Sequence, residues 1–301
     1  MEQDILHSGP ATASLDSGIQ LVYDTFGNPS EAPLLLIQGL SWQMVMWDED
    51  FCSALAGRGY FVIRFDNRDI GQSTHLDHAG IPNIGRLIAD LAAGKPVKVP
   101  YLLSDMAGDS FALLDHLDIS SAHVVGISMG GMIGQIMGLQ DPDRVRSLTS
   151  MSSTTGAPDL PPPTPEAFKI ISTPPPTDRE GFIASFLTMW RVMNGTTFPF
   201  DEERSLRYAE QTFERGLSLA GVARQIAAIN ASGSRREALQ ALIVPTLVIH
   251  GSDDPLLRVE CGIDTAKAVP GSKLRIIEGM GHTLPVPVWE EIIDSIADHA
   301  R

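Results

Sequence analysis

The feature that most constrains the fold is a regular alternation of short apolar runs with segments of helical periodicity. Runs of four to six apolar residues rich in Val, Ile and Leu are typical of strands buried on both faces of a sheet. Such runs occupy residues 34–37, 60–65, 123–127 and 246–249, with a weaker one at 274–277. Residues 20–25 alternate between apolar and polar side chains, which predicts a half-buried edge strand.

Helical patterns fill the intervals between these runs. They cover residues 48–58, 104–117, 129–139 and 290–299. Ser104 and Asp105 are candidate N-caps of the second of these helices. Strands that alternate with helices form β-α-β units, so we expect an α/β fold with a largely parallel sheet covered by helices on both faces.

The middle of the chain departs from this alternation. Residues 156–241 contain no run that resembles a buried strand, and helical patterns recur at 180–192, 201–215 and 219–231. We therefore expect a helical cap at 156–241, inserted between the two parts of an α/β core, 1–155 and 242–301.

Charge limits the partners that this chain can have. It carries 22 Lys and Arg against 37 Asp and Glu, a net charge of −15. Phosphate backbones and anionic membranes should repel it, so neither a nucleic-acid nor a membrane partner is expected. Residues 1–7 lack the basic and apolar segments of a secretory signal, and no run of apolar residues is long enough to span a bilayer. These features favour a cytoplasmic location.

One motif indicates nucleophilic catalysis. Gly126-Ile127-Ser128-Met129-Gly130 is a G-x-S-x-G sequence placed directly between an apolar strand and a helix. A turn this tight requires small neighbours around the central serine and exposes its hydroxyl at the edge of the sheet. The helix that follows directs its positive dipole end at that serine. We expect Ser128 to be a nucleophile; the alternative is a glycine-rich turn with an incidental serine.

A serine hydroxyl needs a base to accept its proton. His282 follows the run at 274–277, so it should lie at the carboxyl edge of the sheet, level with Ser128. His250 competes for this role because it ends the run at 246–249, although it also fits a hydrogen-bonded core histidine. The base in turn needs a carboxylate, and either Asp253 or Asp254 in the loop after His250 could supply it.

Two backbone N–H groups should stabilise an oxyanion next to Ser128. Met129 directly follows the nucleophile, and Leu40 lies in the loop after residues 34–37. Trp42 is expected to line the mouth of the site and Trp190 to contribute from the cap, with core packing as the alternative for each. The proposed chemistry involves no metal ion and no organic cofactor.

Together these residues resemble the α/β-hydrolase superfamily over nearly the whole chain. Residues 66–73 are similar to its D-x-R-G-x-G-x-S loop, with Asp69 in place of the usual glycine. That variant resembles the branch containing aclacinomycin methylesterase and bacterial lipase-like carboxylesterases. The resemblance implies an eight-stranded, mostly parallel sheet with helices on both faces and an inserted helical cap.

The resemblance also assigns the site. Ser128, Asp254 and His282 match the triad positions, and the family spacing favours Asp254 over Asp253. Gln38 stands where many members carry a histidine that supports the oxyanion loop. The resemblance therefore leaves open which side chain supports this loop here. Asp66 and Arg68 are expected to clamp the loop after residues 60–65.

We therefore expect a serine carboxylesterase that hydrolyses short- to medium-chain or small apolar esters through an acyl-enzyme, with a small-molecule ester as its partner. One alternative is a capped hydrolase specific for one natural-product methyl ester, lactone or C–C bond. Another is a non-catalytic hydrolase-fold protein that binds a ligand.

Overall fold

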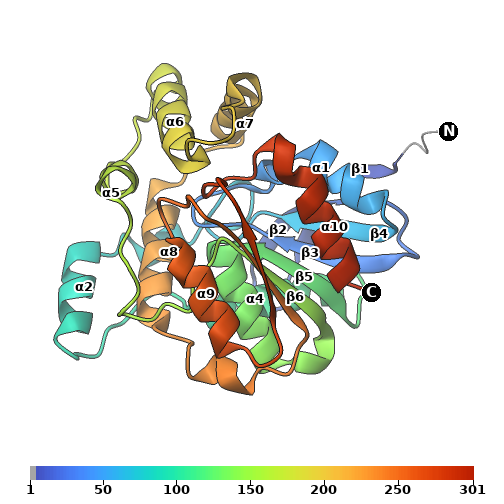
Figure 1. The fold of residues 1–301 in the computed structure, drawn as a ribbon. Helices are drawn as coiled ribbons and strands as arrows, with labels where there is room; N and C mark the ends of the chain where they lie inside the picture. The colour runs from blue at the N-terminus through green and yellow to red at the C-terminus, as the bar shows by residue number, and fades with distance from the viewer. Residues whose placement is uncertain (1–4) are drawn as a thin grey trace.

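The computed structural model describes residues 5–301, and its centre is a single sheet of eight strands (Figure 1). The strands are β1 (His7–Ser14), β2 (Gln20–Phe26), β3 (Ala32–Ile37), β4 (Tyr60–Phe65), β5 (Ala122–Ile127), β6 (Val145–Met151), β7 (Thr246–Gly251) and β8 (Lys273–Ile277). Their order is β1-β2-β4-β3-β5-β6-β7-β8. Only the pairs β1–β2 and β2–β4 are antiparallel. The predicted α/β fold with an eight-stranded, mostly parallel sheet is confirmed.

Ten α-helices accompany the sheet within the described residues. They are α1 (Glu49–Ala56), α2 (Ile84–Ala92), α3 (Leu103–His116), α4 (Met129–Gln140), α5 (Pro165–Ile171), α6 (Arg179–Asn194), α7 (Glu202–Glu214), α8 (Leu219–Ser232), α9 (Val259–Ala268) and α10 (Trp289–His299). None of these helices combines the length and apolar composition needed to cross a membrane.

Alternate side chains of the central strands divide the core between the two faces of the sheet. On β3, Leu35 and Ile37 join a cluster with residues of α3 and α4, whereas Leu34 and Leu36 join a second cluster with residues of α1 and α10. All four are fully buried. Burial of both faces explains why these strands are continuously apolar instead of alternating.

The helices α5–α8 lie between β6 and β7 in the chain and contribute no strand to the sheet. Figure 1 shows α6 and α7 standing off from the sheet. They have a small apolar cluster of their own, made of Phe182, Phe186, Trp190, Tyr208 and Ala209.

The sequence patterns missed two strands, and this changes the edge of the sheet. Residues 20–25 lie in β2, which pairs with both β1 and β4, so the prediction of an edge strand there is wrong. The edge on this side is β1, in which seven of the eight residues are exposed and none is Val, Ile, Leu, Met or Phe, so the strand lacks an apolar pattern. The buried strand β6 was missed because four of its seven residues are Arg, Ser or Thr.

The N-cap prediction for α3 is also wrong. The capping position is Leu102, and Asp105 lies three residues into the helix, where its carboxylate accepts a hydrogen bond from the Leu102 N–H at 2.7 Å. Asp105 therefore closes the first turn from inside the helix, and Ser104 does not cap it.

Candidate active site

Ser128 occupies a strained turn between β5 and α4. Its φ of 55° and ψ of −120° lie outside the common regions for a side chain-bearing residue, and such strain costs about 1–3 kcal/mol. The turn depends on glycine, because a Cβ on Gly126 would lie 2.2 Å from the Gly130 carbonyl oxygen and one on Gly130 would lie 2.0 Å from that of Ile37. The backbone on both sides of Ser128 can therefore approach closely only without side chains.

Neighbouring strands hold this turn in place. The Ser128 N–H donates to the Met151 carbonyl at 2.9 Å, and the Ser153 hydroxyl donates to the Ser128 carbonyl at 2.8 Å. Strain at a functional residue persists only where surrounding contacts determine it. Ser128 remains slightly exposed, at 8%, so its hydroxyl can meet a ligand.

The structure pairs His282 with Asp254. The His282 Nδ1 lies 2.7 Å from Asp254 Oδ2, and both residues are 1% exposed. The other carboxylate oxygen accepts hydrogen bonds from the Leu256 and Leu257 N–H groups, both at 2.9 Å. Asp254 is therefore fixed at both oxygens and can hold the imidazole in one tautomer and orientation.

Asp253, the alternative carboxylate, lies at the surface. The Asp253 side chain is exposed and accepts hydrogen bonds from the Ser252 hydroxyl and, at 3.5 Å, from the Thr197 hydroxyl. The structure brings Asp254, and not Asp253, to His282.

His250 lies behind this pair and not at the cavity. Its Nε2 is 2.7 Å from the Leu257 carbonyl oxygen and 3.5 Å from Asp254 Oδ2. Burial lowers the pKa of His250, so its imidazole is neutral near pH 7. His250 therefore packs against the loop that carries Asp254 and stabilises it.

The C-terminal end of α6 holds His282 from the other side. The Met193 carbonyl oxygen accepts the His282 N–H at 2.6 Å, and a Cβ on Gly281 would lie 2.2 Å from the same oxygen. This contact could not be predicted from the sequence, since nothing in the spacing of Met193 and His282 indicates it.

Leu40 and Met129 are the two residues expected to supply N–H donors. Both residues line the same cavity as Ser128 and His282. Within residues 5–301, no hydrogen bond uses the N–H of Leu40 or of Met129. A Cβ on Gly39 would lie 3.2 Å from Ser128 Cβ, so this loop passes directly beside the serine. Both groups are thus available to an oxyanion.

Three side chains support the Leu40 loop. The Gln38 side chain accepts the Gly39 N–H at 3.1 Å. Asn67 donates to the Gln38 carbonyl at 3.2 Å, and Gln225 of α8 contacts the loop from the far side. Gln38 thus supplies one of these three side-chain hydrogen bonds to the loop.

Asp66 and Arg68 lie in the loop after β4, away from the Ser128 cavity. Arg68 pairs with Asp109 of α3 through two hydrogen bonds of 2.5 and 2.6 Å. Asp66 accepts the Met44 and Gln72 N–H groups at 2.7 and 3.0 Å. Both side chains fix backbone segments around the site.

The cavity at Ser128 has a volume of about 310 Å³ and is enclosed by the core and by helices α5, α6 and α8. Its walls are largely apolar, with Ile170, Phe182, Phe186, Met189 and Leu217 among them. Trp42 lines this cavity and also a neighbouring one. Trp190 lines only the neighbouring cavity, and its ring centroid lies 4.8 Å from that of Trp42. Among residues 5–301, no three His, Cys, Asp or Glu side chains form a group that could hold a metal ion.

Residues 32–286 match the model of the alpha/beta hydrolase fold family. The chain belongs to this family. It is 29% identical to rhodomycin D methylesterase DnrP of Streptomyces peucetius, over 97% of this chain and 98% of the relative. It is 30% identical to rhodomycin D methylesterase DauP of Streptomyces sp. strain C5, over 94% of this chain and 95% of that protein. The predicted resemblance to methylesterases of this family is confirmed.

Solved structures share the fold at lower identity. The esterase RhEst1 of Rhodococcus sp. ECU1013 superposes with a TM-score of 0.73 at 21% identity, covering 96% of this chain and 99% of the other. The enol-lactonase of Burkholderia xenovorans LB400 superposes with a TM-score of 0.71 at 22% identity, with the same coverage.

Proposed function

We propose that this hydrolase is a serine carboxylesterase that cleaves small, uncharged esters through an acyl-enzyme. The observation that carries the proposal is the meeting of Ser128, a fixed Asp254–His282 pair and two free N–H groups at one largely apolar cavity.

The proposed reaction uses each of these groups at a defined step. Ser128 Oγ attacks the ester carbonyl while His282 accepts its proton, and Asp254 stabilises the imidazolium that forms. The N–H groups of Leu40 and Met129 stabilise the oxyanion. His282 then donates its proton to the leaving alcohol, and water repeats the sequence on the acyl group.

The proposed reaction needs a hydrogen bond between Ser128 and His282. Within residues 5–301, no hydrogen bond joins Ser128 Oγ to His282. Such contacts are often long in free enzymes and shorten when substrate binds. The proposal therefore includes a small adjustment of Ser128 or His282 in the complex.

The helices between residues 156 and 241 act as a cap in this proposal, and residues 1–155 and 242–301 form the core. Support comes from the cavity, since α6 and α8 supply much of its apolar wall while Ser128 and His282 come from the core. Apolar walls discriminate weakly between substrates that differ by a few methylene groups, so several acyl lengths should be accepted.

A p-nitrophenyl ester series from acetate to palmitate tests the proposal, with Ser128→Ala as the reference. We expect turnover of the short and medium chains that the alanine variant lacks. Turnover no faster than that of Ser128→Ala for every ester would contradict the proposal.

A second candidate is hydrolysis of one methyl ester on a larger natural product. The relatives that favour it are the two rhodomycin D methylesterases, which match nearly the whole chain. Incubation with rhodomycin D, followed by chromatography of the free acid, distinguishes the candidates. Efficient cleavage of that ester, with little turnover of the p-nitrophenyl series, would favour the second.

A further inference from the structure

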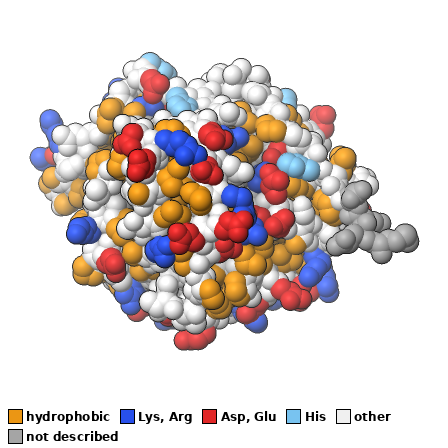
Figure 2. Space-filling model, turned by 90° about the horizontal axis from the view of Figure 1, so that it is seen from above, with side chains coloured by type: hydrophobic (Ala, Val, Ile, Leu, Met, Phe, Trp, Pro, Cys, Tyr) orange, Lys and Arg blue, Asp and Glu red, His pale blue; other side chains and the backbone are white. Residues whose placement is uncertain are grey.

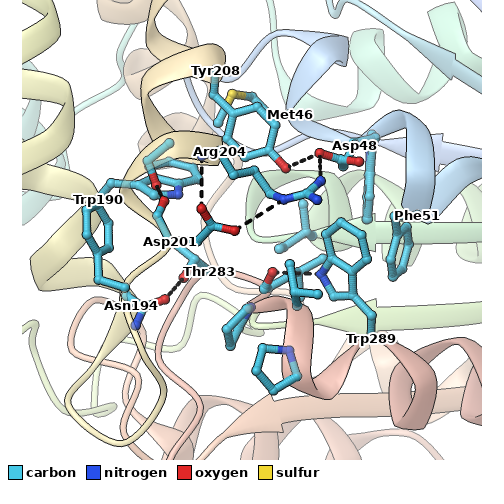
Figure 3. A pocket seen from close by; sticks show the side chains of 18 of the residues that line it. Met46, Asp48, Phe51, Trp190, Asn194, Asp201, Arg204, Tyr208, Thr283 and Trp289 are labelled. Atoms are coloured by element: carbon cyan, nitrogen blue, oxygen red, sulfur yellow. Dashed lines mark hydrogen bonds and ion pairs between the residues drawn. The ribbon is translucent and has the colours of Figure 1, made fainter.

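Three hydrogen bonds join the end of helix α6 to the loop that carries His282. The Met193 carbonyl oxygen accepts the N–H groups of His282 and Thr283, at 2.6 and 3.4 Å. The Thr283 hydroxyl donates to Asn194 Oδ1 at 3.3 Å, as Figure 3 shows. Met193 and Asn194 are the last two residues of α6. Two consecutive residues of the helix therefore hold two consecutive residues of the loop.

We propose that Asn194 and Thr283 are positioning residues of the proposed esterase reaction. Their hydrogen bond keeps the loop of His282 against the end of α6, and so keeps the imidazole in place at the cavity that it shares with Ser128. The inference deepens the proposed function and rests on it, because it names two side chains that act on the reaction through the base and not through the substrate.

Both side chains of this pair are buried. Asn194 is 5% exposed and Thr283 is 3% exposed. The Asn194 amide is fixed at its other end as well, because its Nδ2 donates to the Phe198 carbonyl at 3.0 Å. A buried polar group that loses its partner is costly, since water cannot replace the lost hydrogen bond. The pair therefore favours one position of the loop over any other that would separate the two side chains.

Neither Asn194 nor Thr283 lines the cavity at Ser128. Both line the neighbouring cavity, which has a volume of about 420 Å³ (Figure 3). An ester bound at Ser128 therefore has no direct contact with either side chain. Any effect of the pair on the reaction has to pass through His282, the residue that precedes Thr283 in the chain.

Glycines allow the loop and the end of the helix to pack closely. A Cβ on Gly281 would lie 2.5 Å from the Asn194 carbonyl carbon, and one on Gly279 would lie 2.5 Å from Thr197 Cβ, just beyond α6. Gly195 ends the helix with a φ of 78°, and a Cβ there would lie 3.3 Å from the Gly281 nitrogen. With so little space between them, a shift of one backbone displaces the other.

This junction is also the polar attachment of α6 to the segments that form the sheet and its covering helices. Every hydrogen bond that joins α6 to residues 5–155 or 242–301, all of which the structure describes, involves Met193 or Asn194. The ion pairs of α6 run to α7 instead. The contacts with His282 and Thr283 therefore fix one end of the helix.

The same helix forms a wall of the cavity at Ser128. Phe182, Phe186, Met189 and Met193 line that cavity. They recur every three or four residues, so they lie on one face of α6. The helix that faces the proposed substrate is therefore the helix that holds the backbone of the proposed base.

Thr283→Val tests the inference, because valine keeps the shape of threonine and removes the hydroxyl. With p-nitrophenyl acetate, kcat should fall about tenfold or more, since a displaced base reacts slowly. KM should stay within about twofold of the wild-type value, because no contact with the substrate is lost. Thr283→Ser keeps the hydroxyl and should recover most of kcat. An unchanged kcat in Thr283→Val, a rise in KM alone, or equal losses in the two variants would overturn the inference.

Two further substitutions supply a control and a second way to break the bond. Thr188→Val makes the same change on α6 at an exposed hydroxyl that donates to the Ala184 carbonyl, and it should leave kcat unchanged. Asn194→Ala covers the case in which Thr283→Val does not fold, and it should also lower kcat with KM nearly unchanged. The double variant should lose little more than Asn194→Ala alone, and losses that multiply would contradict a shared role.

A proton NMR measurement separates this inference from the proposed function, because it needs no turnover. The proton between His282 Nδ1 and Asp254 Oδ2, 2.7 Å apart, should give a downfield signal that Asp254→Asn removes. We expect Thr283→Val to shift or broaden this signal and Thr188→Val to leave it unchanged. The same signal in Thr283→Val as in the wild type would overturn the inference. If the wild type hydrolyses no ester while the signal responds as expected, the proposed esterase function fails and the positioning of His282 stands.

Discussion

Ser41 and Gln225, 184 positions apart, are joined by a hydrogen bond from the Ser41 N–H to Gln225 Oε1 at 3.1 Å. Gln225 is fully buried on α8, and its Nε2 donates to the Arg68 carbonyl at 3.0 Å. Ser41 has a φ of 65°, and it follows Leu40, whose N–H is a proposed oxyanion donor. Helix α8 therefore fixes the shape of the loop that carries Leu40.

Replacing Gln225 should impair the chemical step more than substrate binding. Gln225→Met removes the acceptor and leaves the Ser41 N–H without a partner, which costs about 1–3 kcal/mol. We expect kcat to fall at least tenfold with KM nearly unchanged. Gln225→Glu retains an acceptor for Ser41 and should recover part of kcat. Asn230→Ala, on the same helix, is the control. A rise in KM alone would contradict this role.

The acid of the site can be tested by two adjacent substitutions. Asp254→Asn should lower kcat about 10⁴-fold, because the amide favours the wrong tautomer of the base. Asp253→Asn should leave kcat within a factor of two or so, since that side chain is exposed and does not contact His282. Similar losses in both variants, measured with p-nitrophenyl acetate, would contradict the assignment.

The ion pair of Asp69 and Arg224 should contribute to stability. Both side chains are fully buried, with contacts of 2.7 and 2.9 Å that join the β4 loop to α8. Removing one partner of a buried pair costs about 3–5 kcal/mol. Urea unfolding of Asp69→Asn and of Arg224→Met should each show a loss of this size. The double variant should lose less than the sum, and additive losses would show that the residues act independently.

Stability should depend on pH through His123. Burial, followed by the charges of Arg146 and His299, lowers the pKa of His123 to about 4, from 6.5 in a model peptide. The unfolded chain therefore binds a proton more readily, and the free energy of unfolding falls as the pH drops from about 6.5 toward 4. His123→Gln should show a shallower decline over this range in urea titrations. An equal slope in both proteins would contradict this.

The residues of the site that follow strands could be predicted from the sequence. Ser128, Asp254 and His282 each come shortly after an apolar run, and parallel strands bring their carboxyl ends to one edge. The positions of these three residues after the apolar runs therefore predicted that their side chains would lie at the same edge of the sheet. The choice between Asp253 and Asp254 rested on the family spacing, because both lie in one turn.

The contacts that α6 and α8 make with the segments around Ser128 could not be predicted. The Gln225–Ser41 and Met193–His282 hydrogen bonds join segments with no shared periodicity, and their partners are backbone groups that every residue carries. Trp190 was expected to line the site, yet it faces the neighbouring cavity, because helix α6 presents different residues to the two cavities.

Seen from above, the surface carries Lys and Arg side chains among Asp, Glu and apolar side chains (Figure 2). The excess of acidic residues across the chain favours uncharged esters over anionic ones as substrates.

Labelling with a fluorophosphonate tests the central claim most directly, because the reagent reacts with a serine that a neighbouring base activates. We expect one label per chain, mapped by peptide mass spectrometry to Ser128, together with loss of esterase activity. Ser128→Ala should remain unlabelled, and its kcat should be about 10⁶-fold lower than that of the wild type. A label on another residue, or full esterase activity in Ser128→Ala, would contradict the account.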